Sequence, residues 1–456
     1  MRFKLLKHIY FLGIGGIGMS SLARYLHAQG KTISGYDKTP TALTQELQSE
    51  GIRLIFDEEL ASLPSEIDLV VYTPAVPASH LHMQMVQEMG IPMIKRAEML
   101  AWIANENFCI AIAGTHGKTT TTAMVADVLK KSKLKPTAFV GGVMKEYSTN
   151  LLIGEGNHVV VEADEFDRSF LWLRPEITVI NSMDSDHLDI YGDDQHFVEG
   201  FKEFINRTKT GGLVLIQSGC KPYFSPEELD ALCKVYRVKF FGEPEDDFFV
   251  EVVGSSDEGV EFTYVDADGR EEGFLCQMPG KYNLQNASVA ICIAKEIGVR
   301  PYFIKNAVSS FQGIKRRFEV ISEDEIVFVD DYAHHPTELE AAIGAARMKY
   351  PNKSICGIFQ PHLYSRTRDF SSGFAQQLDQ LDEVILMDIY PARELPILGV
   401  TSQIIFEKMK LDKKIMLNEH DEIISYLNSR KPEVIMTLGA GDIDLLVPKI
   451  KKMVEL

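Results

Sequence analysis

The strongest candidate for chemistry in this chain is a glycine-rich segment that leads into lysine and threonine. Its residues are Gly114, Thr115, His116, Gly117, Lys118, Thr119 and Thr120. Glycines let backbone N–H groups approach phosphate oxygens, the lysine neutralises β- and γ-phosphates, and a hydroxyl such as that of Thr119 ligates Mg²⁺. The pattern of strand, glycine turn, lysine and helix predicts an ATP or GTP site, although the first glycine of the strict motif is absent. The helix that follows is expected to place on one face Met124, Val125, Val128 and Leu129.

A second glycine-rich turn lies near the start of the chain, between a strand expected at 8–12 and a helical pattern. Its glycines fit G-x-G-x-x-G and are Gly13, Gly15, Gly16 and Gly18. Asp37 follows the next expected strand, 32–36, about 20 residues further on, where an acid could bind a ribose hydroxyl. The turn predicts that a nucleotide diphosphate, as in NAD or FAD, sits on the helix N-terminus. Glycines that serve only a tight turn and close helix packing are the alternative.

Two further strands, expected at 158–162 and 177–181, end in polar residues. The first runs into Glu162 and two more acids, and the second runs into Asn181 and on to His187. In open parallel sheets, ligands bind beyond the carboxyl ends of the strands. Acids and a histidine at that edge, beside a phosphate loop, suit Mg²⁺ held against a γ-phosphate, with solvated loop residues as the alternative.

These motifs must be positioned by several α/β domains, because 456 residues exceed what one core holds. Residues 1–105 are expected to form a Rossmann-like domain, and residues 106–313 a central phosphate-loop domain with a parallel sheet. Within the latter, 248–276 alternates like a small antiparallel patch. Residues 314–456 are expected to form a second Rossmann-like domain, with strands at 326–329, 354–359, 384–388 and 434–438.

Composition excludes several classes of partner. The chain has a net charge of -18, so it lacks the basic excess that nucleic-acid or membrane-surface binding requires. Six cysteines without a C-x-x-C pair favour buried free thiols over disulfides or a zinc site. The basic N-terminus leads into the glycine turn without an A-x-A cleavage site, which favours a first strand over a signal peptide. Because no apolar run reaches the ~18 residues of a membrane helix, a cytoplasmic protein is expected.

Longer motifs carry a resemblance over nearly the whole chain: GTHGKTTTT, VEADEFDRSF, DHLDIY, FQGIKRRFE, DDYAHHPTE and FQPHLYSRTRD. With two nucleotide-binding patterns ahead of a third α/β domain, the chain resembles the Mur ligase family. The resemblance implies an ATP- and Mg²⁺-dependent ligase that acts on UDP-N-acetylmuramate and L-alanine in peptidoglycan precursor synthesis. LGIGGIGMSSLA and DDYAHHPTE favour the alanine-adding branch over the branch that recycles murein tripeptide. A monomer and a homodimer are both open.

The resemblance also implies roles for single residues. UDP, not NAD, would be bound by Gly13, Gly15, Gly16 and Gly18, with Asp37 on the ribose. ATP would be bound by Gly114, Thr115, Gly117, Lys118, Thr119 and Thr120, with Asn283 at adenine and Arg317 and Asp331 near ATP. Thr119 and Glu162 would hold one Mg²⁺ and His187 a second. The acceptor and amino-acid side would be lined by His116, His334 and Arg366.

Three positions depart from the family's pattern. Leu363 stands where some members carry Arg, so the amino-acid carboxylate would depend more on Arg366. Phe166 replaces a small polar residue near the sugar contacts. Lys202 lies where other branches use a carbamylated lysine, a device not expected in the alanine-adding branch.

Such a ligase would use ATP to phosphorylate the lactoyl carboxylate, and the amine of alanine would attack the acyl phosphate. His334 or another base would accept the proton of the ammonium group. The third domain would recognise the amino acid and close over the other two.

Two other classes of protein compete with this interpretation. A dehydrogenase, suggested by 13–18 with Asp37, leaves the phosphate loop unused, and a regulatory ATPase would hydrolyse ATP regardless of sugar nucleotides.

Overall fold

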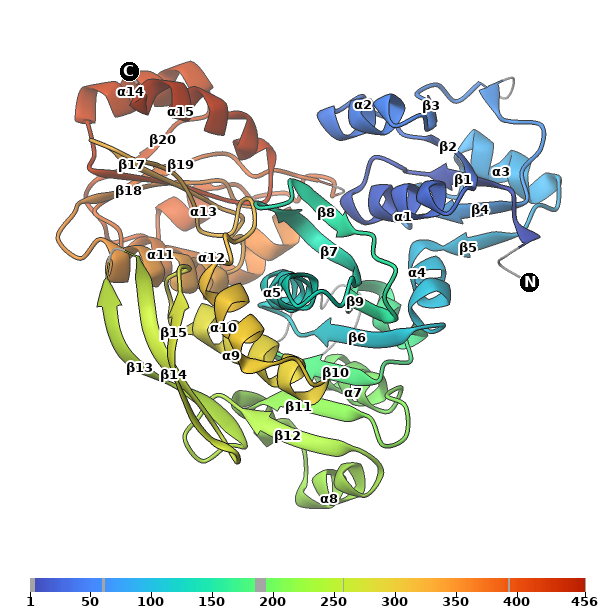
Figure 1. The fold of residues 1–456 in the computed structure, drawn as a ribbon. Helices are drawn as coiled ribbons and strands as arrows, with labels where there is room; N and C mark the ends of the chain where they lie inside the picture. The colour runs from blue at the N-terminus through green and yellow to red at the C-terminus, as the bar shows by residue number, and fades with distance from the viewer. Residues whose placement is uncertain (1–4, 60–61, 185–193, 257, 393, 456) are drawn as a thin grey trace. The chain divides into compact units, whose positions relative to one another are not determined.

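The computed structural model describes residues 5–59, 62–184, 194–256, 258–392 and 394–455. It divides into two compact units, whose elements are labelled in Figure 1. The first unit comprises Met1–Glu251, Phe262–Phe274 and Gln285–Phe311. The second comprises Val252–Glu261, Leu275–Leu284 and Gln312–Leu456, so it draws on two short stretches from the middle of the chain.

The first unit opens with a five-stranded sheet in the order β3-β2-β1-β4-β5. Its strands are β1 (His8–Leu12), β2 (Thr32–Tyr36), β3 (Arg53–Ile55), β4 (Leu69–Tyr72) and β5 (Met93–Lys95). All pairings are parallel, and the helices between strands and after β5 are α1 (Ile17–Ala28), α2 (Ala42–Ser49), α3 (Leu81–Glu88) and α4 (Arg96–Ala104). This arrangement confirms the predicted Rossmann-like fold, in which the carboxyl ends of β1, β2 and β4 meet at one edge.

A ten-stranded sheet follows, in the order β15-β14-β13-β12-β11-β10-β6-β9-β7-β8. Its first six strands in the chain are β6 (Phe108–Ala113), β7 (Thr137–Met144), β8 (Thr149–Leu152), β9 (His158–Glu162), β10 (Ile177–Ile180) and β11 (Leu213–Gln217). The others are β12 (Arg237–Phe241), β13 (Phe248–Ser256), β14 (Gly259–Asp266) and β15 (Gly269–Cys276). The patch predicted at 248–276 is therefore present, and it extends the sheet from β12.

The helices that belong with this sheet are α5 (Lys118–Lys131), η3 (Phe166–Trp172), α7 (Asp194–Ile205), η4 (Ser218–Tyr223), α8 (Pro226–Val235), α9 (Lys281–Glu296) and α10 (Pro301–Ser309). One face of β6, formed by Cys109, Ala111 and Ala113, belongs to the core cluster that contains Met99 of α4 and Phe201 of α7. Successive strand residues point to opposite faces, and β6 is buried on both, as a continuous apolar run predicts for a parallel sheet.

Helix α5 differs from its prediction. The sequence pattern predicts one apolar face, but every residue from Thr119 to Leu129 is buried. The helix packs on β6, β7 and β9 and also on α10, so this stretch has no solvent-facing side. Its buried acid, Asp127, consequently has partners: it accepts a hydrogen bond of 2.5 Å from the Tyr147 hydroxyl and pairs with Lys131 at 2.9 Å.

The second unit contains a six-stranded sheet in the order β16-β17-β21-β18-β19-β20. The strands are β16 (Glu319–Glu323), β17 (Val327–Asp331), β18 (Ile355–Phe359), β19 (Glu383–Leu386), β20 (Lys414–Met416) and β21 (Val434–Leu438). Edge strand β16 is antiparallel and the other pairings are parallel. The helices are α11 (Pro336–Lys349), α12 (Tyr364–Leu378), α13 (Gln403–Phe406), α14 (His420–Arg430), η5 (Asp442–Leu445) and α15 (Val447–Val454).

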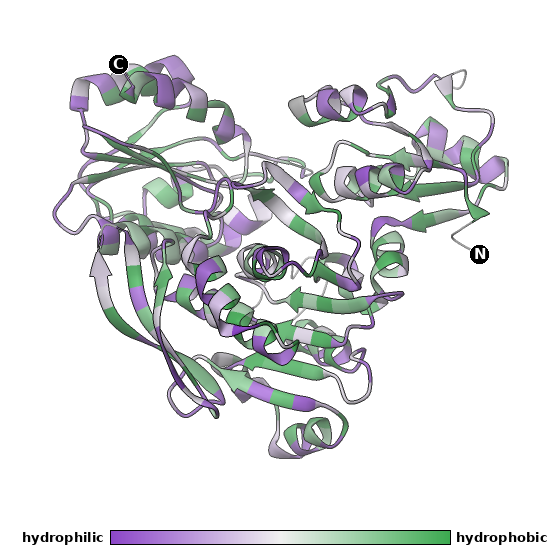
Figure 2. Cartoon of the chain, in the orientation of Figure 1, coloured by the Kyte–Doolittle hydropathy of each residue, from purple (hydrophilic) through white to green (hydrophobic). Residues whose placement is uncertain are grey.

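Two core clusters cover the two faces of this sheet. Val329 and Phe359 pack with Leu339 of α11 and Phe374 of α12, whereas the opposite face packs against α14 and α15. Both faces are covered by helices, which confirms a second Rossmann-like domain. Figure 2 shows hydrophobic residues running along strands such as β6, β10 and β11.

Two predictions about composition can be compared with the described residues. Five cysteines are buried and free, as expected, but Cys233 on α8 is free and exposed. Helix α8 has no buried residue, so its cysteine faces solvent. In the part of the chain that the structure describes, none of the helices has the length and apolar character needed to span a membrane.

Candidate active site

The phosphate loop joins β6 to α5, and its two glycines are required by backbone conformation. Gly114 has a φ of +133° and Gly117 a φ of +77°, in the region that favours glycine. Space is also short: a Cβ on Gly114 would lie 2.8 Å from the Ser182 nitrogen, and one on Gly117 would lie 2.9 Å from Oδ1 of Asn286. Thr119 and Thr120 form the first turn of α5 with Lys118 and are buried. The loop therefore has the backbone that close approach to phosphate requires.

Lys118 is held by oxygen atoms of the loop and by one carboxylate. Its Nζ donates to the Gly114 carbonyl at 2.6 Å, the Thr115 carbonyl at 3.2 Å and Oε1 of Glu165 at 2.8 Å. Burial alone would lower the pKa of Lys118, but the negative charge of Glu165 and nearby acids raises its pKa overall. Burial raises the pKa of Glu165 to about 7. The ammonium charge is thus preserved at the position where phosphate oxygens are expected.

Glu162 lies at the end of β9 and contacts two neighbouring elements. Its Oε1 accepts a hydrogen bond from the Thr119 hydroxyl at 3.1 Å, and its Oε2 accepts one from the Gly141 N–H at 2.8 Å. β6 lies between β9 and β10, so their carboxyl ends share an edge. A hydroxyl and a carboxylate in contact form the start of the all-oxygen ligand set that Mg²⁺ prefers.

The other predicted metal ligand, His187, lies outside the described residues. Within the described ranges, no group of three or more His, Cys, Asp and Glu side chains forms a metal cluster. Lys202, which lies on α7, pairs with Glu228 at 2.8 Å.

His116 and Thr115 are fixed by the segment that follows β10. The His116 N–H donates to the Ser182 hydroxyl at 2.8 Å, and its ring Nε2 lies 3.7 Å from Oδ2 of Asp184. The Thr115 hydroxyl donates to the Asp184 carbonyl at 2.6 Å. The polar strand end predicted at Asn181 therefore positions the loop.

A second polar network beneath the loop includes a residue that sequence reasoning missed. The Thr121 hydroxyl donates to Oδ1 of Asn286 at 2.9 Å and accepts from Nδ2 of Asn181 at 2.9 Å. Asn286 lies on α9, one turn after the predicted adenine ligand Asn283, whose amide donates to the Pro279 carbonyl at 2.7 Å. No local signal identifies Asn286 in the sequence, because its partner Thr121 lies far away along the chain.

The N-terminal glycine turn is organised by Asp37. Oδ2 of Asp37 accepts a hydrogen bond of 2.7 Å from the Gly15 N–H, and a Cβ on Gly15 would lie 2.7 Å from that same atom. Gly13 has a φ of +84°, Gly16 is the N-cap of α1, and Gly18 lies against the Arg96 guanidinium. The glycines and the acid predicted to bind a nucleotide are thus brought together at the carboxyl edge of the sheet.

Two ion pairs join this first sheet to the segment that carries Glu162 and Glu165. Arg96 pairs with Asp164 at 3.2 Å, and Lys95 pairs with Asp167 at 2.6 Å. Asp167 and Arg168 both adopt left-handed backbone, with φ of +53° and +54°. Backbone strain of this kind persists where surrounding contacts enforce it, and it is concentrated near functional sites.

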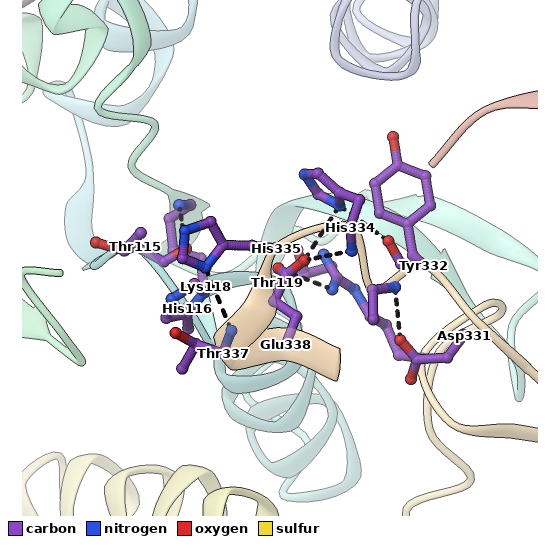
Figure 3. Close-up of polar contacts among 12 residues, drawn as sticks. Thr115, His116, Lys118, Thr119, Asp331, Tyr332, His334, His335, Thr337 and Glu338 are labelled. Carbon is purple, nitrogen blue, oxygen red and sulfur yellow. Dashed lines mark hydrogen bonds and ion pairs between the residues drawn. The ribbon is translucent and has the colours of Figure 1, made fainter. Parts of the chain in front are cut away.

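In the second unit, Asp331 ends β17, and His334 and Glu338 lie close to it, as Figure 3 shows. Asp331 accepts hydrogen bonds of 2.7 Å from the Phe318 and Ala333 N–H groups, and burial raises its pKa to about 6. His334 Nδ1 lies 2.9 Å from the Tyr332 carbonyl and 3.1 Å from Glu338, which also lies 3.6 Å from Arg317. Burial lowers the pKa of His334, so its ring is mostly neutral at neutral pH.

Arg366 lies in the first turn of α12 with only 6% of its surface exposed. Arg368, two residues on, is exposed and pairs with Asp369 at 2.7 Å. The two arginines of the motif FQPHLYSRTRD therefore differ: Arg366 is buried and Arg368 is exposed. The ring of His362, just before α12, lies 5.7 Å from that of His334. The second unit thus contains all four of its predicted site residues, Arg317, Asp331, His334 and Arg366. It also contains Glu338 and His362, which were not predicted as site residues.

Comparison with family models finds three consecutive matches. Residues 8–108 match the catalytic domain of the Mur ligase family, residues 112–294 the Mur ligase middle domain, and residues 316–441 the glutamate ligase domain of Mur ligases. Together these ranges cover most of the chain.

Whole proteins are similar over nearly their full length. A UDP-N-acetylmuramate–L-alanine ligase of Flavobacterium johnsoniae is 45% identical over 100% of this chain and 99% of its own. The crystal structure of the UDP-N-acetylmuramate–alanine ligase of Thermotoga maritima superposes with a TM-score of 0.83 at 27% identity, covering 99% of both chains. A murein peptide ligase of Psychrobacter arcticus, with a TM-score of 0.71, 23% identity and 98% of both chains covered, shares the fold.

Proposed function

The chain belongs to the Mur ligase family, and we propose that it joins L-alanine to the lactoyl carboxylate of UDP-N-acetylmuramate with ATP, releasing ADP and phosphate. A relative with this name is 45% identical over the whole chain, which supports the choice of substrates. The observation that carries the chemistry is the meeting of Lys118, Thr119 and Glu162 at one edge of the central sheet.

The phosphate loop would bind the β- and γ-phosphates of ATP through its backbone N–H groups and Lys118. Transfer of the γ-phosphate to the lactoyl carboxylate converts a poor electrophile into an acyl phosphate. Attack by the alanine amine then gives an amide and inorganic phosphate. Lys118 is nearly buried, with 14% of its side chain exposed, so its charge acts where water screens it weakly.

The oxygen ligands at this edge of the sheet fit Mg²⁺ as the associated metal. Thr119 and Glu162 would hold it with hard oxygen ligands, and His187 would bind a second ion. When bound, Mg²⁺ would supply positive charge to the phosphate oxygens.

We assign UDP binding to residues 1–105, ATP binding to 106–313 and amino-acid recognition to 314–456. Gly13, Gly15, Gly16 and Gly18 would approach the diphosphate, with Asp37 near the ribose, and Asn283 would contact adenine. Arg317 and Asp331 would act on the ATP side. The free cysteines and the use of ATP favour a cytoplasmic location.

The amino acid would be held by Arg366 and deprotonated by a neighbouring base. A methyl group offers only ~1–3 kcal/mol of discrimination in an apolar pocket, so the carboxylate must supply most of the affinity. Arg366 can form a charge-assisted pair with it. His334, whose pKa is lowered by burial, is available to accept a proton at neutral pH, and His116 would line the acceptor side.

The decisive experiment is release of ADP by the purified protein with UDP-N-acetylmuramate and each candidate amine. We expect release with L-alanine and much less with glycine, L-serine or murein tripeptide. Faster release with the tripeptide would assign the recycling reaction instead. ADP release that does not depend on the sugar nucleotide would indicate a regulatory ATPase.

A further inference from the structure

We propose that Glu394 is a positioning residue of the amino-acid site, because it holds the turn of α12 that presents Arg366. This inference rests on the proposed function, in which Arg366 binds the carboxylate of alanine. Glu394 lies between β19 and α13, in a connection whose described residues are 387–392 and 394–402, almost 30 residues beyond Arg366 in the chain. Its role therefore follows from a tertiary contact and not from a local sequence motif.

Glu394 makes two hydrogen bonds to one residue of α12. Its Oε2 accepts from the Ser365 N–H at 2.9 Å, and its Oε1 accepts from the Ser365 hydroxyl. Ser365 immediately precedes Arg366. A carboxylate that accepts two hydrogen bonds from adjacent donors fixes orientation as well as distance, and each such bond is stronger than a neutral one.

The start of α12 needs this external partner. Its N-cap is Leu363, which has no side-chain oxygen and makes no capping hydrogen bond. The first N–H groups of a helix have no intrahelical acceptor, and a side-chain oxygen at the N-cap usually accepts from the second or third of them. Ser365 is the second residue of α12, so Glu394 accepts the hydrogen bond that Leu363 cannot.

Leu363 is also strained, which makes the turn dependent on its contacts. Its φ of +71° lies in the left-handed region, an uncommon conformation for leucine. The Leu363 N–H donates to the Tyr390 carbonyl at 3.0 Å, and the Tyr390 N–H donates to the Pro361 carbonyl at 2.8 Å. The ring of His362 stacks on Tyr390 at 5.8 Å. The same connection thus supports the turn by backbone, ring and carboxylate contacts.

In the middle of this connection, the described apolar side chains do not take over the role of the Glu394 carboxylate. Ile389 and Val400 anchor its ends and are 8% and 7% exposed, whereas Leu395 and Leu398 are 85% and 102% exposed. Apolar contacts therefore secure the ends but not the segment around Glu394. Removing the carboxylate is expected to release the centre of the connection and the first turn of α12 together.

The contact between Glu394 and Ser365 limits which hydrogen-bond donors can bind the alanine carboxylate. Because Glu394 already occupies the Ser365 N–H, that donor is not available to the bound carboxylate, and we expect the Arg366 guanidinium to bind it. The orientation of Arg366 then limits affinity for alanine, whereas the ATP and UDP-sugar contacts belong to other residues.

We test this with Glu394→Ala, Glu394→Gln and Ser365→Ala in the full-length protein. Steady-state KM values are measured for L-alanine, ATP and UDP-N-acetylmuramate, and hydrogen exchange is measured over 360–370. We expect Glu394→Ala to raise the KM for L-alanine about tenfold or more, a change equal to about 1.4 kcal/mol, with the other KM values within about twofold. Glu394→Gln, which retains one acceptor oxygen, should be intermediate. Exchange over 360–370 should rise in the same order.

The matched control is Glu407→Gln, since Glu407 is exposed and accepts a hydrogen bond from Gln403 at 3.1 Å. It should resemble the wild type in every measurement. Faster exchange in Glu394→Ala with an unchanged KM for L-alanine would overturn the positioning role, as would a rise in the KM for ATP alone. A wild-type protein that does not turn over L-alanine would instead refute the proposed function, while the exchange data would still report the contact.

Discussion

Oε1 of Glu165 lies 2.8 Å from Nζ of Lys118, and the side chain of Glu165 is only 2% exposed. The phosphate-loop lysine is thus balanced by a carboxylate within the protein. Because phosphate oxygens would share the same ammonium group, Glu165 sets the electrostatic state that a nucleotide encounters.

Glu165→Gln should change how stability depends on pH. Burial raises the pKa of Glu165 to about 7, above its ordinary value of 4.5. The stability that the protonated form provides is complete below about pH 4.5 and is lost as the pH rises through 7. The glutamine variant cannot ionise, so its melting temperature relative to the wild type should rise between pH 5 and pH 8. Thermal unfolding at several pH values measures this difference.

The control for that series is Glu155→Gln, because Glu155 is 84% exposed in its pair with Lys135. Its melting temperature should follow the wild type. A constant difference between Glu165→Gln and the wild type from pH 5 to 8 would contradict ionisation near neutrality.

Lys118→Ala should abolish ligation while the fold survives, since the lysine's functional partner is phosphate charge. A loss of at least about 10²–10³ in kcat is expected, the range for one removed electrostatic donor. Lys118→Arg should be a poor substitute, because a planar guanidinium differs from a compact ammonium. Product formation measures the loss of ligation, and circular dichroism measures whether the fold survives. Lys135→Ala, at an exposed ion pair, is the matched control, and near-normal turnover by Lys118→Ala would refute the phosphate-loop assignment.

Glu162→Gln should raise the Mg²⁺ concentration needed for half-maximal rate by about 10- to 100-fold. Its carboxylate contacts the Thr119 hydroxyl and the Gly141 N–H, so the variant also tests whether this edge holds the metal. Binding of UDP-N-acetylmuramate without ATP, measured by calorimetry, should change little. His187→Ala should behave in the same way. If the Mg²⁺ dependence of a variant matches that of the wild type, the replaced residue is not a metal ligand.

Arg366→Ala should raise the KM for L-alanine by about 10- to 100-fold, the expected cost of a charged hydrogen bond. The KM values for ATP and UDP-N-acetylmuramate should change far less. Arg368→Ala removes an exposed arginine from the same helix and should have little effect. If affinity for ATP falls and affinity for alanine does not, Arg366 is a phosphate ligand.

Strands with apolar residues on both faces were predictable from sequence. β1, β2, β9 and β21 have the predicted bounds, because each is a short apolar run with turn residues around it. β3, β8 and β20 were not predicted. Each is only three or four residues long and lies at a sheet edge, where one side has no neighbouring strand and the hydrophobic signal is weak. The position of helix α5 was predicted from sequence, but its complete burial was not. Its second packing partner, α10, is far away along the chain.

Residues within motifs were also predictable, whereas residues that support them from a distance were not. The sequence places Lys118 in a recognisable loop, but nothing near Glu165 indicates that it contacts that lysine. Asn286 reaches Thr121 from another part of the chain, and Glu394 reaches Ser365 across an irregular connection. Such contacts arise from tertiary packing, which a single sequence does not specify by spacing.

The discontinuous composition of the second unit has a consequence during synthesis. Val252–Glu261 and Leu275–Leu284 are translated well before Gln312–Leu456, with which they form that unit. As the chain leaves the ribosome from its N-terminus, both early stretches must wait for the last third of the polypeptide. A gene fragment that begins at residue 312 would therefore encode an incomplete unit. Exchange of this region between ligases by recombination would have to carry the two earlier stretches as well.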